Sequence, residues 1–262
     1  MRSAGVSARA SRSKGLGLAA GWLLALVVIV LFTLLGRWQL GRMHEKQARL
    51  EVAAHALDNR IPQPLLLASD PARAEAYDWA AGRGDIAGDT LWLDNQIHAG
   101  VPGVRMYCVL FPDDGVQALL VDAGWWPLDA QRDLPVFGCP AARGMSVRGL
   151  LAPPPSSGLA SGVPLAAAGP RRWLATRLDL PAIAQALSLS TGVAPRVLRL
   201  DPVRDKGDAG VMLAPGQRDL DILPNTLTPE RHLGYAVQWF GLALTVFVIA
   251  VVLTVRRRGR PS

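Results

Sequence analysis

A histidine and two aromatic residues lie at regular spacing where a long apolar stretch begins. His232, Tyr235 and Trp239 are spaced i, i+3 and i+7, which places them on one face of a helix. His232 falls in the first helical turn, where the positive end of the helix dipole disfavours imidazolium. A neutral imidazole keeps a free nitrogen for binding a metal. These three residues therefore form a candidate metal-binding site.

The alternative interpretation of these residues is structural. Tyrosine and tryptophan are enriched at membrane–water interfaces, and in this interpretation His232 is hydrogen-bonded to the soluble domain. Polar groups at the edge of a membrane are costly, so the histidine needs a partner or a ligand in either case.

The apolar stretch itself predicts a transmembrane helix over residues 232–255. Thr228 can cap the helix, and Pro229 suits its first position. Leu233–Val255 contains 23 residues, which span roughly 34 Å and therefore cross a bilayer. Arginines at 256–258 end the span, and residues 256–262 form a basic tail.

A second apolar run, residues 16–35, predicts another transmembrane helix near the N-terminus. It is longer than the apolar region of a secretory signal and ends in Gly36-Arg37-Trp38, so we expect an uncleaved anchor. Gly17 and Gly21 form a G-x-x-x-G motif that permits close helix packing. Residues 1–15 form a basic tail predicted to be disordered, and residues 37–56 predict a polar juxtamembrane helix.

Charge is concentrated at the two ends of the chain. Residues 1–36 contain four basic and no acidic residues, and residues 256–262 also contain four basic and no acidic residues. The middle of the chain has 20 Lys and Arg against 21 Asp and Glu. This distribution is the positive-inside signature of a membrane protein with both termini cytoplasmic. It does not predict a nucleic-acid partner, which would need a basic face on the folded domain.

The middle of the chain predicts one extracytoplasmic domain over residues 36–231. Pro-, Gly- and Asp-containing turns separate short strand-like runs, and Leu180–Leu189 predicts a helix capped by Asp179. The fold class is therefore a mainly antiparallel β (α+β) domain, barrel- or sandwich-like, flanked by two transmembrane helices. The strand-like runs cover residues 77–86, 90–96, 105–111, 117–123, 146–151, 172–176 and 196–201.

Other reactive residue types give weaker signals. No nucleophile elbow, phosphate-binding loop or metalloprotease helix is present, so no enzyme activity is predicted. Cys108 and Cys139 are compatible with one disulfide in an oxidising compartment or with two separate thiols. Among the remaining histidines, His44 is the better candidate for a second metal ligand, and we expect His55 and His98 to be solvated or bonded to backbone.

Four segments resemble the Surfeit locus protein 1 family, whose members are cytochrome c oxidase assembly factors. Their order and the two-span topology match across nearly the whole chain. The third segment has Asp122-Ala123-Gly124-Trp125 where the family usually has Asn-Arg-Gly-Trp, which suggests a divergent bacterial member. The four segments are Leu35–Arg42, Asn95–Gly103, Leu120–Pro127 and Arg231–Phe240.

The resemblance implies a membrane chaperone that binds haem a transiently and assists its insertion into oxidase subunit I. The histidine that the family associates with haem maps onto His232, which would be an axial ligand of the iron. Tyr235 and Trp239 would pack beside the ring, and Arg231 or Arg37 would pair with a propionate. Implied partners are oxidase subunit I, other oxidase assembly factors and membrane lipid.

A different class of function fits the same topology. The chain would then be a membrane-anchored scaffold that stabilises an oxidase assembly intermediate without binding haem, with Trp125 and Trp126 as interface anchors. For either function the composition favours a bacterial inner membrane over a mitochondrial inner membrane, with the central domain in the periplasm.

Overall fold

The structure is a computed structural model that describes residues 4–156, 162–203, 217–223 and 226–258. It contains two compact units. We call residues 1–48 with 227–262 the helical unit, and residues 49–226 the β domain.

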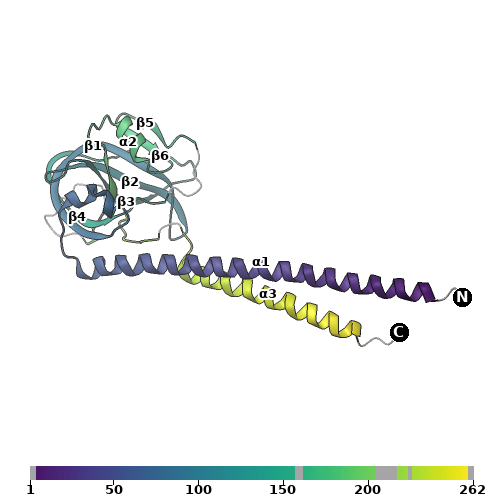
Figure 1. Cartoon of the computed structure of the whole chain (residues 1–262). Coiled ribbons are helices and arrows are strands. Elements are labelled where there is room, and N and C mark those ends of the chain that lie inside the picture. The colour runs from purple at the N-terminus through teal and green to yellow at the C-terminus, as the bar shows by residue number, and fades with distance from the viewer. Residues whose placement is uncertain (1–3, 157–161, 204–216, 224–225, 259–262) are drawn as a thin grey trace. The chain divides into compact units, whose positions relative to one another are not determined.

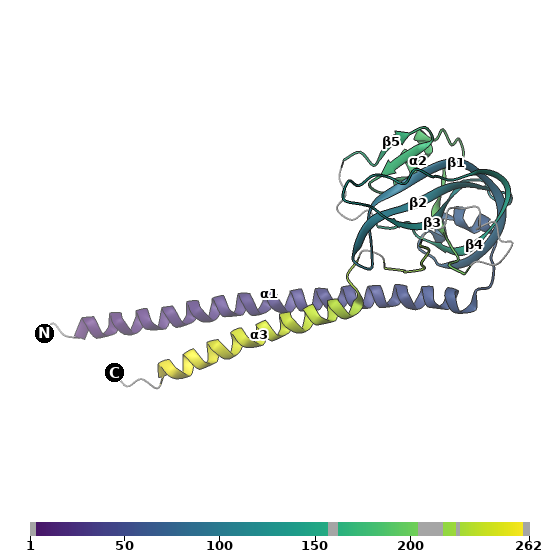
Figure 2. The same cartoon turned by 180° about the vertical axis from the view of Figure 1, so that it is seen from behind.

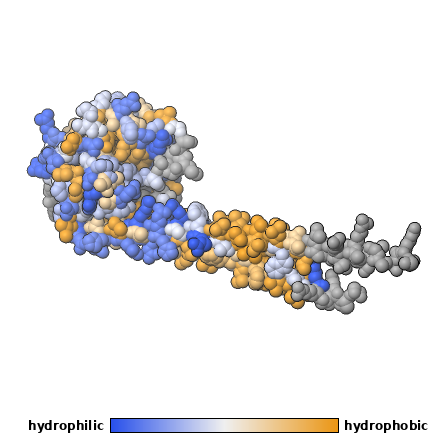
Figure 3. Space-filling view, viewed as in Figure 1, coloured by the Kyte–Doolittle hydropathy of each residue, from blue (hydrophilic) through white to orange (hydrophobic). Residues whose placement is uncertain are grey.

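Two long helices, α1 (Ala4–Asn59) and α3 (Pro229–Arg258), build the helical unit. They run side by side near the start of α3 and separate toward their terminal ends (Figures 1 and 2). Both helices are long and apolar enough to cross a membrane, and apolar side chains gather along them (Figure 3). The structure therefore confirms two apolar helices near the ends of the chain. α1 is helical from Ala4, so the predicted disorder is wrong from that residue on, because Ala, Arg and Lys are good helix formers.

Small residues bring the two helices into contact away from the predicted motif. A Cβ built on Gly36 of α1 would lie 2.8 Å from the Phe240 ring of α3, so a larger residue would require this ring to shift. The Phe32 and Trp239 rings pack 5.4 Å apart beside it. Gly17 and Gly21, by contrast, have no atom of α3 within 4 Å of a built Cβ. The G-x-x-x-G motif therefore does not mediate the packing of α1 on α3.

The β domain is an α+β domain around a seven-stranded mixed sheet with the order β2-β3-β7-β4-β1-β6-β5. Because the long strand β1 also pairs with β2, the pairings of β1, β2, β3, β7 and β4 form a closed cycle. The elements of the domain are β1 (Asp78–His98), β2 (Val101–Pro112), β3 (Ala118–Pro127), β4 (Ala141–Ala152), β5 (Leu165–Gly169), β6 (Arg172–Ala175), α2 (Leu180–Ala186), β7 (Val193–Leu200) and the 3-10 turns η1 (Leu65–Ser69) and η2 (Pro71–Arg73).

Tertiary pairing changed two features of the predicted strands. The runs 77–86 and 90–96 join into β1, because the Gly88 region is accommodated as a register shift between Ile86 and Thr90 and not as a turn. Five pairings among the described strands are antiparallel, which agrees with the predicted mainly antiparallel domain. The pairings β1–β6 and β3–β7 are parallel and were not predicted. Parallel neighbours are joined by long connections, which local sequence patterns do not reveal.

Both faces of the central strands are buried. Met106 and Cys108 of β2 belong to one core cluster, and Tyr107 and Val109 belong to a second cluster with Ile183 of α2. Asp179 caps α2 as predicted, since its carboxylate accepts a hydrogen bond from the Ala182 amide. Cys108 and Cys139 form a disulfide, which decides between the two states that the sequence left open.

Candidate functional site

His232 lies on the face of α3 that contacts α1. Its side chain is buried, with 6% exposure, and its Nδ1 lies 2.6 Å from the Oε1 atom of Gln39 on α1. Gln39 is buried as well. The two residues are 193 positions apart in the chain, so this contact exists only because the two helices pack together.

This hydrogen bond determines which imidazole nitrogen carries the proton. The side-chain oxygen of Gln39 can only accept, so Nδ1 of His232 donates. In the neutral ring Nε2 then holds the free lone pair. Within the described part of the chain, Nε2 is buried and has no hydrogen-bond partner. The packing of α1 on α3 thus leaves a buried ring nitrogen whose lone pair is uncommitted.

A buried lysine fixes the start of α3 beside this histidine. Lys46 of α1 donates a hydrogen bond from its ammonium to the backbone carbonyl of Leu227, and its side chain is buried. The His232 amide in turn donates to the Thr228 carbonyl in the first turn of α3. The backbone around His232 is therefore tied to α1 as well as to its own helix.

The other predicted site residues differ in where they lie. Trp239 is half-buried against Phe32 of α1, on the same side as His232. Tyr235 is 42% exposed and therefore lies outside this contact. Arg231 and Arg37 are both exposed, which leaves their guanidinium groups accessible to a ligand.

The remaining histidines do not join His232. His44 is exposed. His55 is exposed and contacts Asn59. His98 packs on Trp125, with ring centroids 5.3 Å apart, and lies 3.6 Å from Asp219, so the expectation of a solvated or backbone-bonded His98 is wrong. No group of three or more His, Cys, Asp or Glu side chains that could hold a metal ion is found in the described ranges.

The tryptophans proposed as interface anchors are largely internal. Trp125 is buried and donates its indole N–H to the Gln96 carbonyl. Trp126 is half-buried and packs edge-on against Trp92. Trp125 is therefore a core residue, because Gln96 and His98 at the end of β1 cover it, and its predicted role as an anchor is wrong.

A buried charge cluster lies in the β domain. Arg105 of β2 contacts Asp122 at 2.9 Å and Asp219 at 2.5 Å, and Arg199 of β7 contacts Asp219 at 2.6 Å. Burial alone would raise the pKa of Asp219, but the guanidinium groups of Arg105 and Arg199 outweigh it and lower that pKa. The cluster fastens the segment around residue 219 to the sheet.

The SURF1 family model matches residues 26–244 of the chain. The chain belongs to the SURF1 family. This family consists of cytochrome oxidase assembly factors, so the protein is a membrane protein of cytochrome c oxidase assembly. The resemblance seen in the four sequence segments is thereby confirmed. No curated protein matches the sequence significantly.

Sequence reasoning did not single out Gln39 in this SURF1 family member. The sequence nevertheless contains a pattern that could have identified Gln39. The spacing of Gly36, Gln39 and Lys46 places these three residues of α1 on one helical face. All three are buried in the structure. A glycine followed by polar residues at this spacing on a helix exposed to lipid or water indicates a face that needs a partner helix.

Proposed function

We propose that this SURF1 family member binds haem a transiently through His232 and assists its insertion into oxidase subunit I. The observation that supports this proposal is the buried Nε2 atom of His232, which lacks a hydrogen-bond partner in the described part of the chain. A buried polar atom without a partner is costly and asks for an explanation. A metal ligand is the explanation that fits an imidazole whose other nitrogen already donates.

The residues around His232 fit a haem group. Imidazole is a common axial ligand of haem iron. The Gln39 carbonyl would act as an outer partner that orients the ring and raises its basicity. Trp239 and Tyr235 supply aromatic surface, and the exposed guanidinium groups of Arg231 and Arg37 suit carboxylates such as propionates. The apolar faces of α1 and α3 would accommodate an isoprenoid tail.

Access to His232 requires a local rearrangement. Its Nε2 has no exposed surface, so side chains of α1 or α3 must move before the atom can bind iron. Opening and closing of this contact would allow the protein to hold a reactive group and then release it. A carrier needs both steps, since its cargo passes to another protein.

The proposal includes an orientation. The basic ends of both helices would lie in the cytoplasm, following the positive-inside rule. The β domain would lie in the periplasm of a bacterial cell. The Cys108–Cys139 disulfide supports this side of the membrane, because disulfides persist in oxidising compartments.

The test is the haem absorbance of the purified full-length protein from cells that make haem a. We expect His232→Ala to lose this absorbance while membrane insertion is unchanged. His44→Ala is the matched control, because His44 is an exposed histidine of α1. Full haem occupancy in the His232→Ala variant would reject the ligand role.

Capture of oxidase subunit I separates the carrier from a scaffold. If the protein is a carrier, a variant that cannot bind haem should deliver less haem a to the oxidase, even if that variant still binds subunit I. A His232→Ala variant that captures subunit I and restores oxidase haem a content to the wild-type level would favour the scaffold.

A further inference from the structure

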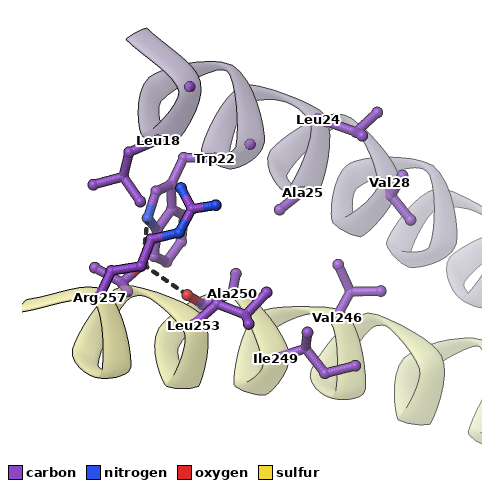
Figure 4. A pocket seen from close by; sticks show the side chains of 13 residues that line it. Leu18, Trp22, Leu24, Ala25, Val28, Val246, Ile249, Ala250, Leu253 and Arg257 are labelled. Carbon is purple, nitrogen blue, oxygen red and sulfur yellow. Dashed lines mark hydrogen bonds between the residues drawn. The ribbon is translucent and has the colours of Figure 1, made fainter. Parts of the chain in front are cut away.

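A groove of about 330 Å³ lies between α1 and α3 in the part of the helical unit distant from His232 (Figure 4). Small residues of α1, Gly21 and Ala25, line one side, and Val246 and Ile249 of α3 line the other. A Cβ built on Gly21 meets no atom within 4 Å. The small side chains of α1 therefore leave space beside α3 and do not pack against it.

A hydrogen bond between the two helices spans one end of the groove. The Trp22 indole N–H of α1 donates to the Thr254 hydroxyl of α3 at 2.9 Å. Thr254 also donates to the carbonyl of Ala250, one turn earlier. In hydrocarbon such a bond has no competing water, and it helps to hold two helices together. Because the bulky indole makes this link, the helices stay apart at Gly21 and the groove remains open.

A single charged side chain lines the described part of the groove. Arg257 of α3 lies at its terminal end, and its side chain points toward α1 beside Leu18 and Trp22 (Figure 4). Arg257 is exposed, and Arg256 and Arg258 flank it in the sequence. The remaining lining is almost entirely apolar. The groove thus combines an apolar slot with a positive charge at one end.

We propose that this groove binds an anionic phospholipid, with an acyl chain beside Gly21 and Val246 and the headgroup phosphate paired with Arg257. An open void would forfeit the dispersion contacts of the side chains that line it. Basic pockets between transmembrane helices bind anionic headgroups. A helix of a partner protein would need an acidic side chain at the membrane edge to pair with Arg257, whereas an anionic phospholipid always carries its phosphate there. The proposal does not depend on haem binding at His232.

The test is native mass spectrometry of the full-length protein released from nanodiscs. The nanodiscs contain equal amounts of phosphatidylglycerol and phosphatidylcholine with identical acyl chains. We expect the wild-type protein to retain the anionic lipid about fivefold over the neutral one, the ratio that one arginine near the membrane surface supports. Arg257→Ala should bring this ratio close to one, and Gly21→Leu should reduce the retention of both lipids.

Two matched variants control for charge and for added bulk. Arg256→Ala removes an exposed arginine outside the groove, and Gly241→Leu adds a leucine at an exposed position of α3, also outside the groove. Both should retain lipid as the wild-type protein does. Ala25→Leu fills the same groove as Gly21→Leu and replaces that variant if it is not recovered in the membrane.

Three results would overturn the proposal. The first is equal retention of the two lipids by the wild-type protein. The second is the same loss of preference in Arg256→Ala as in Arg257→Ala. The third is a wild-type dimer that Gly21→Leu abolishes without changing lipid retention, which would identify the groove as an interface between two copies of the chain.

Discussion

At the scale of single residues, the proposed haem binding rests on the pair of His232 and Gln39. A histidine in the first turn of a membrane helix has two common uses, as a structural hydrogen-bond donor or as a metal ligand. Here the hydrogen bond uses only Nδ1, and the buried Nε2 is left without a partner in the described chain. One nitrogen thus fulfils the structural role, and the second nitrogen is the one that the proposal assigns to the haem iron.

Replacing Gln39 tests whether the outer partner matters for haem binding. Gln39→Leu removes the acceptor of the Nδ1 proton, so the ring loses its fixed tautomer and orientation. We expect the affinity for haem a to fall by roughly 10- to 100-fold, the usual effect of losing such a partner. Haem titration followed by absorbance measures this change.

Two further substitutions make the test specific. Gln39→Glu keeps an acceptor and should retain haem binding, with a lower reduction potential of the bound iron because the imidazole becomes more basic. Gln47→Leu removes an exposed glutamine of the same helix and should have no effect. Equal affinities of Gln39→Leu and the wild-type protein would show that Gln39 does not position His232.

At the scale of elements, buried ionic contacts and one disulfide hold the β domain. Arg105 of β2 and Arg199 of β7 both contact Asp219, which lies in the segment between β7 and α3. Cys139 lies in the connection from β3 to β4 and is bonded to Cys108 of β2. Both contacts fasten irregular segments to strands that are already paired.

Asp219→Asn should destabilise the β domain by about 3 kcal/mol, because it leaves two buried guanidinium groups short of a counter-charge. Urea unfolding followed by tryptophan fluorescence measures this change. The exposed Asp113 provides the control, and Asp113→Asn should change stability by less than about 0.5 kcal/mol.

Stability should also depend on pH through Asp219. Its pKa is lowered in the folded state, with the guanidinium groups of Arg105 and Arg199 outweighing burial, so the unfolded chain binds this proton more readily. The stability that the ionised Asp219 contributes is therefore fully present above the unfolded pKa of about 3.9. It is lost as the pH falls through the lower pKa of the folded state. In Asp219→Asn this part of the acid sensitivity should disappear. If the pH dependence of stability is the same in Asp219→Asn and in the wild-type protein, Asp219 is not the source of this acid sensitivity.

The disulfide closes a loop with a sequence separation of 31 residues. Replacing both cysteines, as Cys108→Ser with Cys139→Ser, should lower the free energy of unfolding by about 3–4 kcal/mol, because the unfolded chain regains the entropy of that loop. The urea midpoint measures this effect. Reducing agent should lower the midpoint of the wild-type protein and leave that of the double variant unchanged.

At the scale of the whole molecule, the proposed function depends on the side of the membrane on which the β domain lies. Alkaline phosphatase is active only after export. Fused within residues 204–216, it should therefore be active, and fused after Ser262 it should be inactive. A green fluorescent protein fusion after Ser262 should show the opposite behaviour. An active phosphatase after Ser262 would reverse the proposed orientation and place His232 at the cytoplasmic surface.

Local patterns in the sequence determined the two apolar helices, the start of α3 at Pro229 and the cap of α2 at Asp179. These features depend on hydropathy, helix periodicity and side chains within a few positions of one another, so one segment of sequence is enough to predict them. The same patterns marked His232 as a candidate ligand. The central α+β domain was predictable from short strand-like runs, although the merging of two runs into β1 was not.

Only the tertiary structure decided which residues meet across long stretches of chain. It paired His232 with Gln39, joined Cys108 to Cys139 and placed β6 parallel to β1. It also moved Trp125 from a supposed surface anchor into the core. Each of these outcomes depends on the packing of distant segments, whose free energy comes from shared burial and is absent from the pattern of any one segment.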